Sequence, residues 1–318
     1  MGDNRITLSF ILPARNEEVF ISGALRSIKK HAALIRHEVV VADNGSTDAT
    51  CESARQEGAI VIEDAAGTIA AVRNKGASFA QGRILVFMDA DVLLTPRWQE
   101  GIDRTIKALD ADPMLITGSR CGAPEDGTWI VRYWFARKRL AQANYINSGH
   151  LIVTRTLFDR VNGFNEAMKT SEDYDFSVRG VRAGGRIVDA PDLPVIHLGF
   201  PATIASFVKR EMWHGTDDFN GIRKMLASKP ALIALLNFAA LLSTLASVAL
   251  TRSALFVWLY IAMMAAVAGA TAMSRFGFGG LRTFMMSSSI AYLYITGRTL
   301  ALISGMKRRV QTVFCATR

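Results

Sequence analysis

Two long apolar runs near the C-terminus constrain this chain most. Residues 230–250 and 253–273 contain no charged side chain, and only Thr251 and Arg252 separate them. A helix needs about 20 apolar residues to cross the hydrocarbon of a bilayer, so each run has the length of one span. Buried helices of a large soluble core are the alternative, but two such runs in succession rarely fit inside a globule. We therefore predict transmembrane helices at about 230–250 and 253–273.

The charges are divided unevenly along the chain. All 28 Asp and Glu lie at or before Asp218, and nine of the 37 Lys and Arg lie in residues 226–318. The first 225 residues are therefore neutral, and the net charge of +9 belongs to the apolar tail. Basic residues without acids are typical of membrane flanks, and no aromatic-and-basic binding module accompanies them. The pattern favours a membrane as partner and argues against nucleic acid.

A third apolar stretch, residues 284–304, is interrupted by Arg298 and by three consecutive serines. Because a charge inside a span is costly, this stretch is either a full span or a re-entrant or interfacial helix. Two spans would place the basic residues 307–309 on the cytoplasmic side, whereas three would place them outside. The three cysteines are isolated, which suits a reducing compartment. We expect a multi-pass protein of the cytoplasm or inner membrane whose polar part faces the cytoplasm.

The first 225 residues alternate short apolar segments with segments of helical spacing. The segments 8–12, 38–42, 59–62 and 83–88 have the length and composition of strands. This alternation predicts an α/β fold with a mostly parallel sheet, right-handed crossovers and helices on both faces. Ligands of such sheets bind beyond the carboxyl ends of the strands.

Candidate site residues stand at the ends of three of these strands. Pro13 ends the first strand, Asp43 follows the second, and Asp89 and Asp91 follow the fourth. Carboxylates leaving a core are costly to desolvate, so the last two need a positive charge, for which a divalent cation is the obvious candidate. Two acids in a loop are more often a solvated turn. Here, however, polar groups at neighbouring strand ends converge on one crevice.

The chain carries five short motifs: LPARNEE at 12–18, DNGSTD at 43–48, AVRNKG at 71–76, DAD at 89–91 and ED at 172–173. Together they resemble the family 2 glycosyltransferases of the nucleotide-sugar-binding GT-A fold. Their order and separation match the family over about residues 5–215. The resemblance implies a Rossmann-like GT-A catalytic domain over residues 1–225, followed by a membrane domain over residues 226–318.

The resemblance also assigns residues to a donor, a nucleoside-diphosphate sugar of the UDP or GDP type. The set comprises Pro13, Ala14, Arg15, Glu17, Asp43, Gly45, Ser46, Arg73 and Asp89. Within it, Asp43 would accept hydrogen bonds from the base, Arg73 would face the donor side, and Asp89 would lie near the ribose.

A metal and a general base are implied as well. Asp91 would ligate Mg²⁺ or Mn²⁺, with Asp89 and His197 as further ligands, although a lone His is more often structural. The ion would stabilise charge on the diphosphate leaving group. Asp173 matches the family's general base, which takes the acceptor proton while the anomeric carbon is attacked from the opposite face, so that configuration inverts. Glu172 beside it would either raise the pKa of the base or cap the helix.

A motif of the family's processive polysaccharide synthases is missing. Those enzymes carry Gln-x-x-Arg-Trp on an interfacial helix, and Lys209 and Met212 stand here in place of the Gln and the Arg. Two or three tail helices also offer little material for a polymer channel. We therefore predict transfer of a single sugar to a membrane-associated acceptor, either lipid-linked or a glycolipid.

Two further hypotheses belong to other classes. One is a catalytically silent nucleotide-sugar-binding scaffold in envelope polysaccharide assembly, against which the intact Asp89, Asp91 and Asp173 argue. The other is a nucleotidyltransferase, which is disfavoured because no Gly-rich phosphate loop opens the chain.

Overall fold

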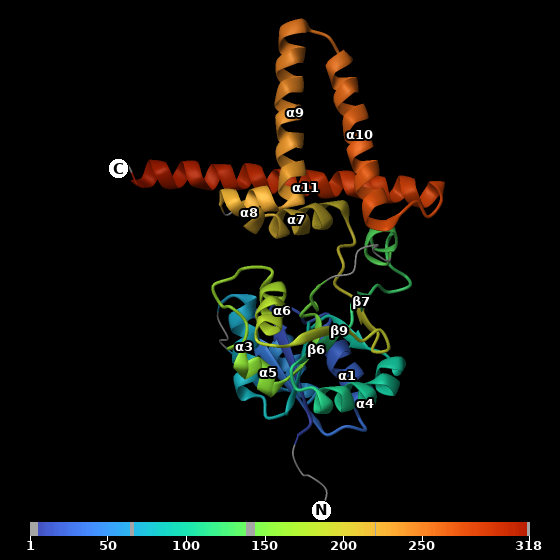
Figure 1. The fold of residues 1–318 in the computed structure, drawn as a ribbon, viewed down its shortest axis with the longest axis vertical. Helices are drawn as coiled ribbons and strands as arrows, with labels where there is room; N and C mark the ends of the chain where they lie inside the picture. The colour runs from blue at the N-terminus through green and yellow to red at the C-terminus, as the bar shows by residue number, and fades with distance from the viewer. Residues whose placement is uncertain (1–5, 64–66, 138–143, 220, 317–318) are drawn as a thin grey trace, which may run out of the picture. The chain divides into compact units, whose positions relative to one another are not determined.

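The computed structural model describes residues 6–63, 67–137, 144–219 and 221–316 (Figure 1). The chain divides into two compact units. The first comprises Met1–Pro124 and Ala143–Gly199. The second comprises Glu125–Gln142 and Phe200–Arg318. The second unit therefore begins earlier in the chain than the membrane domain expected at residues 226–318.

The first unit is built around a seven-stranded sheet with the order β3-β2-β1-β4-β8-β6-β9. Its strands are β1 (Leu8–Ala14), β2 (His37–Asp43), β3 (Ile60–Ile62), β4 (Ile84–Met88), β6 (Leu115–Gly118), β8 (His150–Thr154) and β9 (Arg186–Asp189). Strands β1 to β4 are parallel, whereas β8 runs antiparallel to both of its neighbours, β4 and β6. The predicted mostly parallel sheet is confirmed, with one reversed strand inside it.

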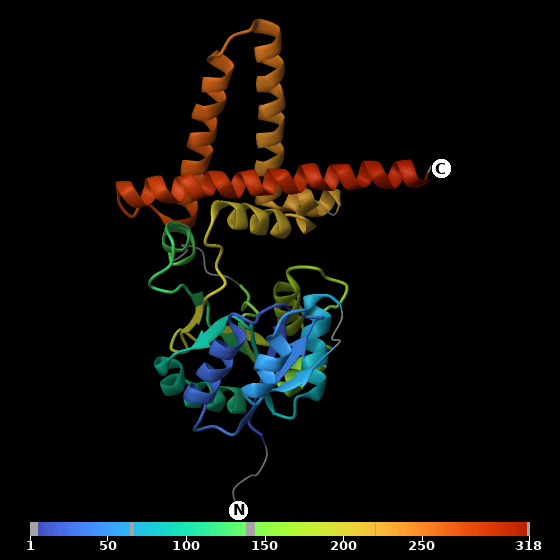
Figure 2. The ribbon, with the colours of Figure 1, turned by 180° about the vertical axis from the view of Figure 1, so that it is seen from behind.

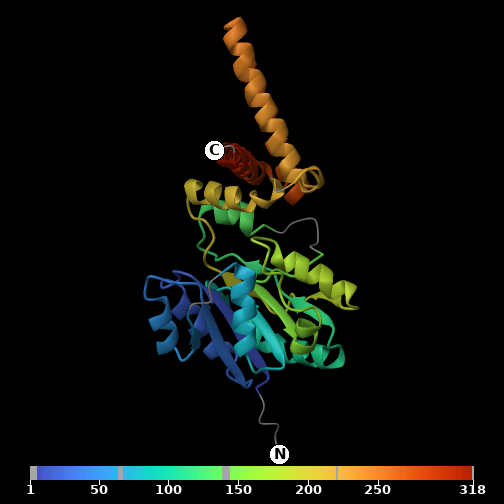
Figure 3. The same ribbon diagram turned by 90° about the vertical axis from the view of Figure 1, so that its left-hand side faces the viewer.

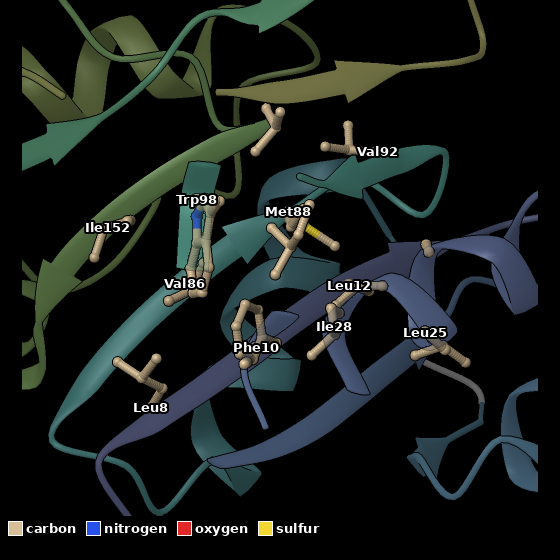
Figure 4. Close-up of a cluster of buried hydrophobic side chains, with 14 of the residues drawn as sticks. Leu8, Phe10, Leu12, Leu25, Ile28, Val86, Met88, Val92, Trp98 and Ile152 are labelled. Carbon is tan, nitrogen blue, oxygen red and sulfur yellow. The ribbon is translucent and has the colours of Figure 1, made fainter. Parts of the chain in front are cut away.

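Helices pack on both faces of this sheet. They are α1 (Ile21–His31), α2 (Thr50–Gln56), α3 (Ile69–Phe79), α4 (Pro96–Ala111), α5 (Arg155–Arg160) and α6 (Glu172–Arg182). Because successive strand residues point to opposite faces, β1 supplies two separate cores. Phe10 packs with Ile28 of α1 and Trp98 of α4 (Figure 4), whereas the next residue, Ile11, belongs to the cluster that contains Phe176 of α6.

Hydroxyl side chains fix where several helices begin. Thr68 and Thr95 accept hydrogen bonds from the first-turn N–H groups of α3 and α4, and Pro96 occupies a first-turn position of α4. Ser228 caps α9 (Lys229–Thr251) in the same way. Such side chains satisfy backbone donors that a helix start leaves without partners.

A smaller sheet lies beside the ends of the large one. It joins β5 (Val92–Leu94), β10 (Val195–His197) and β7 (Cys121–Gly122) in that order. β10 pairs antiparallel with β5, so that His197 stands opposite Val92. The pairing brings a residue from late in the unit next to the acids that follow β4.

The second unit consists of helices. Besides α9 they are η1 (Val131–Phe135, a π-helix), α7 (Ile204–His214), η2 (Asp217–Phe219), α8 (Ile222–Ala227), α10 (Leu255–Phe276) and α11 (Leu281–Ala316). α9 and α10 form an antiparallel hairpin (Figures 1 and 2) at the positions predicted for the two spans, and each is long and apolar enough to cross a membrane. The third apolar stretch is part of the longer helix α11, which crosses the base of the hairpin and is seen end-on in Figure 3.

Candidate active site

Asp89, Asp91 and His197 lie together beyond the carboxyl end of β4. One ligand atom from each lies within 4.8 Å of the others, and His197 Nε2 is 3.3 Å from Asp91 Oδ2. The two acids occupy the turn between β4 and β5, and the pairing of β10 with β5 delivers the imidazole. Carboxylate oxygens with an imidazole nitrogen are ligands that a divalent cation accepts.

Burial, and then the neighbouring carboxylates, disfavour ionisation of the acids here. Burial raises the pKa of Asp91, and the charge of Asp89 raises it further, against the opposing effect of His197. Burial, followed by the charges of Asp91 and Asp89, raises the pKa of Glu17 to about 7. A cation between these groups would stabilise their ionised forms, so the residues present fit the metal that the sequence implies.

Arg73 of α3 joins the metal-site acids to helix α6. Its buried guanidinium donates to Asp89 Oδ1 at 2.7 Å and to Glu172 Oε1 at 2.6 Å. Glu172 Oε1 also accepts from the hydroxyl of Ser148 at 3.3 Å. The side chain that was expected to face the donor is thus held by carboxylates of the DAD and ED motifs, and it connects the two motifs directly.

Asp173 is buried at the start of α6. Its Oδ2 accepts from Asn147 Nδ2 at 3.1 Å and from the backbone N–H of Ser148 at 3.4 Å, and its Oδ1 accepts from the N–H of Tyr174 at 2.8 Å. Burial, followed by the charge of neighbouring Glu172, raises the pKa of Asp173 to about 6. A carboxylate of this kind is ionised at neutral pH, yet it is more basic than an ordinary aspartate.

The loops after β1 and β2 are tied to each other. Asn16 accepts from the N–H of Thr47 at 2.8 Å, and its own N–H donates to Ser46 Oγ at 2.9 Å. The N–H of Glu17 donates to Thr50 Oγ1 at 2.8 Å. Asn16 holds a left-handed conformation with φ of 56°, which is uncommon for a residue with a side chain. The two loops therefore form one preorganised surface.

The remaining donor-site residues occupy this surface or its base. Pro13 and Ala14 are buried at the end of β1, whereas Arg15 and Gly45 are exposed in the loops. Asp43 accepts from both the N–H and the hydroxyl of Ser46. Asp43 thus shapes its own loop, and its contact with a nucleotide base stays a prediction.

Sequence reasoning missed the loop Asn147–Gly149, which contacts both Asp89 and Asp173. β8 runs antiparallel to β4, so the residues before β8 meet the residues after β4. The N–H of Asp89 donates to the carbonyl of Gly149 at 3.4 Å, and a Cβ on Gly149 would lie 3.0 Å from Asp89 Oδ2. The available signal was a run of turn-forming residues directly before an apolar strand.

Gly199 is a second missed residue. Any Cβ at this position would overlap Asp91 Oδ2, and the neighbouring N–H of Leu198 donates to the carbonyl of Asp91 at 2.8 Å. Only glycine lets the backbone approach the acid this closely.

Comparison with known proteins agrees with this site. Residues 9–161 match the model of the family described as glycosyl transferase family 2. The glycosyltransferase AglE of Haloferax volcanii is 28% identical over 207 residues, which cover 61% of this chain and 67% of that protein. The 4,4'-diaponeurosporenoate glycosyltransferase of Staphylococcus haemolyticus is 38% identical over 100 residues, 29% of this chain and 26% of that one.

A solved structure shares the fold. The mannosyltransferase PcManGT from Pyrobaculum calidifontis, in complex with GDP-Man and Mn²⁺, has a TM-score of 0.54 and 20% sequence identity. The match covers 96% of this chain and 87% of that chain. Residues 9–161 therefore form a glycosyltransferase family 2 domain, and the chain has the GT-A fold of the solved mannosyltransferase.

Proposed function

We propose that the protein transfers one sugar from a UDP- or GDP-type sugar to a membrane-associated acceptor, with a divalent cation and with inversion at the anomeric carbon. The observation that carries this proposal is the pair of contacts made by Arg73. One guanidinium binds Asp89 of the metal set and Glu172, the neighbour of Asp173. The groups for the donor phosphates and the group for the acceptor proton are thereby parts of one site.

Asp89, Asp91 and His197 would hold the cation, and the site residues fit Mg²⁺ or Mn²⁺. The imidazole shifts the preference towards Mn²⁺, because nitrogen ligands suit transition metals better than Mg²⁺. The Mn²⁺ in the PcManGT complex supports the same choice, and its GDP-Man supports a nucleotide-sugar donor. Bound there, the ion would neutralise charge that builds on the diphosphate as it leaves.

Asp173 would act as the general base. As the acceptor hydroxyl oxygen bonds to the anomeric carbon, its proton passes to Asp173, and the bond from that carbon to the phosphate oxygen breaks. The electron pair of that bond leaves with the nucleoside diphosphate. Asn147 and Ser148 hold the carboxylate in position through donors to its Oδ2. Direct attack with a base on the acceptor side supports inversion.

The helical hairpin supports an acceptor in the membrane and transfer of single sugars. Two apolar helices can anchor the chain, but they give little material for a polymer channel. Basic residues gather at the base of the hairpin, at or before the start of α9 and at or after the last turn of α10: Arg223, Lys224, Lys229, Arg275 and Arg282. The tip carries Arg252 alone. The positive-inside tendency therefore supports a cytoplasmic location for the base of the hairpin and for the catalytic unit that precedes it in the chain.

The test uses the full chain in lipid nanodiscs with UDP-glucose, UDP-N-acetylglucosamine and GDP-mannose, and with lipid extracts as acceptors. We expect release of nucleoside diphosphate with one donor, a glycolipid detected by mass spectrometry, and an inverted anomer by NMR. Asp91→Asn should abolish transfer, and Asp103→Asn, an exposed acid on α4, should not. Transfer that survives a chelator and Asp91→Asn would refute the metal, and a retained anomer would refute inversion. Donor binding without turnover on any lipid would favour the silent scaffold.

A further inference from the structure

Helix α11 is in close backbone contact with α7. A Cβ on Gly297 of α11 would lie 2.8 Å from Glu211 Cβ and 3.0 Å from the carbonyl oxygen of Val208. A Cβ on Gly215, directly after α7, would lie 2.8 Å from Ala301 Cβ. The two glycines allow the helices to meet near residues 297–301 of α11, so the depth of this part of α11 in a membrane fixes the depth of α7.

Charged groups make that contact incompatible with the bilayer core. Arg298 of α11 donates to Asp218 Oδ2 at 3.0 Å and to Glu211 Oε2 at 3.2 Å. Arg210 of α7 binds the other oxygen of Glu211 at 3.0 Å. If α11 spanned the membrane, its middle would carry this cluster and the rest of α7, which includes Lys209, into hydrocarbon, where each charge is costly.

The next residue of α11 attaches it to the hairpin. Thr299 Oγ1 accepts from Asn237 Nδ2 of α9 at 2.9 Å, and Asn237 Oδ1 accepts from Tyr260 of α10 at 2.9 Å. α11 crosses the hairpin steeply in Figures 1 and 3. Few residues in the most apolar parts of α9 and α10 are buried within the protein, 17% and 22% respectively. Helices that cross in this way do not span the same bilayer together, so a spanning hairpin leaves α11 along the surface.

The uncovered face of α11 suits that location. Within residues 281–305, whose side chains the structure describes, the exposed large apolar residues are Leu281, Met285, Tyr292 and Leu300, with exposed Arg282 beside them. At 3.6 residues per turn these five fall within an arc of about 100°. Leucine and methionine with tyrosine and arginine are the residues that helices place at the boundary between acyl chains and headgroups.

We propose that α11 lies along the membrane–water boundary, with this face against lipid, and that the chain crosses the bilayer only twice. The residues before α9 and the end of α11 are then on the same side. Arg298, which argues against a simple span in the sequence, is explained by its partners on α7 and η2. The proposal depends on the membrane association in the proposed function and is independent of the transfer reaction, which enters neither test below.

Depth measurement tests the surface location. Spin labels are attached to single cysteines in the full chain, with the natural cysteines replaced by serine, reconstituted in vesicles of phosphatidylcholine and phosphatidylglycerol. The labelled variants are Met285→Cys, Tyr292→Cys and Leu300→Cys on α11, and Leu245→Cys on α9 as a deep control. We expect equal, shallow depths for the three α11 labels and a greater depth for the control. A spanning α11 would separate the depths of labels 285 and 300 by about 22 Å. That result, or α11 labels shielded from lipid by a second copy, would overturn the proposal.

Tag accessibility tests the number of spans. The full chain carries different epitope tags at its two ends, and sealed and permeabilised cells are stained with antibodies to each. Two spans predict that both tags become accessible only after permeabilisation, as does a cytoplasmic marker. A C-terminal tag that is stained in sealed cells while the N-terminal tag is not would establish a third span and refute the proposal.

Discussion

Two arginines, buried Arg73 in the first unit and partly buried Arg298 in the second, make the same kind of contact with opposite consequences. Arg73 bridges Asp89 and Glu172, and Arg298 bridges Glu211 and Asp218. Each guanidinium draws its partners from elements that are distant in sequence. Breaking such a bridge is destabilising to the extent that it leaves a buried charge without a partner.

The surroundings of the two arginines differ. Around Arg73, the pKa of Asp173 is raised to about 6, chiefly by burial and then by Glu172, and that of Glu17 to about 7, chiefly by burial and then by Asp91. Around Arg298, the pKa of His214 is lowered to about 3, chiefly by burial and then by Arg210 and Arg298. The first cluster has surplus negative charge and suits a cation and a base, whereas the second is balanced and serves to hold helices together.

The largest expected effect is on the base of the first cluster. Asp173→Asn keeps the size of the side chain but removes its ability to accept a proton, so we expect kcat to fall by about 10²–10⁴-fold, the usual contribution of general base catalysis. Donor affinity, measured by calorimetry, should stay within about twofold, because the substitution leaves the donor loops intact. Asp103→Asn is the control. A loss of kcat below tenfold would remove Asp173 from the proposed role.

A substitution in the second cluster should lower the stability of the fold instead of the rate. Arg298→Met takes one guanidinium from buried Glu211, which keeps its contact with Arg210, and from partly exposed Asp218. We therefore expect the free energy of unfolding to fall by at most about 3 kcal/mol, the low end for a buried pair. Denaturant titration of the full chain in detergent measures this loss. Adding Glu211→Gln should recover part of it, because the buried carboxylate that has lost one of its two arginines is then neutral. An unchanged denaturation midpoint in Arg298→Met would contradict a structural role for the cluster.

A metal ion should distinguish the clusters by binding only the first. Mn²⁺ at one hundred times its Kd should stabilise the folded chain by about 2.7 kcal/mol, since it binds the native state alone. Asp91→Asn should lose this thermal shift, and Arg298→Met should keep it despite a lower starting Tm. A shift that persists in Asp91→Asn would place the ion elsewhere.

The position of the acids was predictable, and that of their partners was not. Parallel strands end at one edge of a sheet, so strand endings alone placed Pro13, Asp43 and Asp89 near one another. The loop at Asn147 reaches the same edge because β8 is reversed, and strand direction after a long connection leaves no mark in the sequence. Arg73 was recognised as a site residue, but its contact with Glu172 depends on how α3 and α6 face each other.

Contacts between segments that are far apart in the chain also escaped prediction at two other places. His197 reaches Asp91 only because the three-residue strand β10 pairs with β5, a contact about a hundred residues apart in the chain. Its role as a ligand stays a prediction. In the apolar tail, composition and length located both helices of the hairpin, but the partners of Arg298 come from α7 and η2, whose packing on α11 no local pattern indicates.

The pH dependence of the reaction should report the charge surplus around Asp173. The base must be ionised, so kcat/KM should fall about tenfold per pH unit below about pH 6, the raised pKa. Because folding raises this pKa from 3.8, the group contributes stability that is present below pH 3.8 and is lost as the pH rises to about 6. Asp173→Asn should therefore be more stable than the parent chain at pH 8.

Glu172→Gln separates the effect of the neighbouring charge on the pKa of Asp173 from the effect of burial. Removing the neighbouring charge should lower the pKa of Asp173 and move the acid limb of the kcat/KM profile to lower pH. Glu166→Gln, on an exposed loop side chain, is the matched control. An acid limb that stays in place would mean that burial alone sets the pKa of the base.

The smallest expected effect comes from the amide that holds the base. Asn147→Ala removes a donor to the ionised form of Asp173, so the acid limb should move to higher pH, opposite to the effect of Glu172→Gln. Because Asn147 is exposed, its hydrogen bond should contribute about 1 kcal/mol, which raises the pKa of Asp173 by about 0.7 unit. The base is then still mostly ionised at pH 7.5, so kcat there should stay within about twofold. Asn165→Ala, which removes another exposed amide that accepts a backbone hydrogen bond, is the control and should leave the profile unchanged. A shift to lower pH in Asn147→Ala would mean that the amide favours the protonated acid, and Asp173 would then be held in a form that is unable to act as a base.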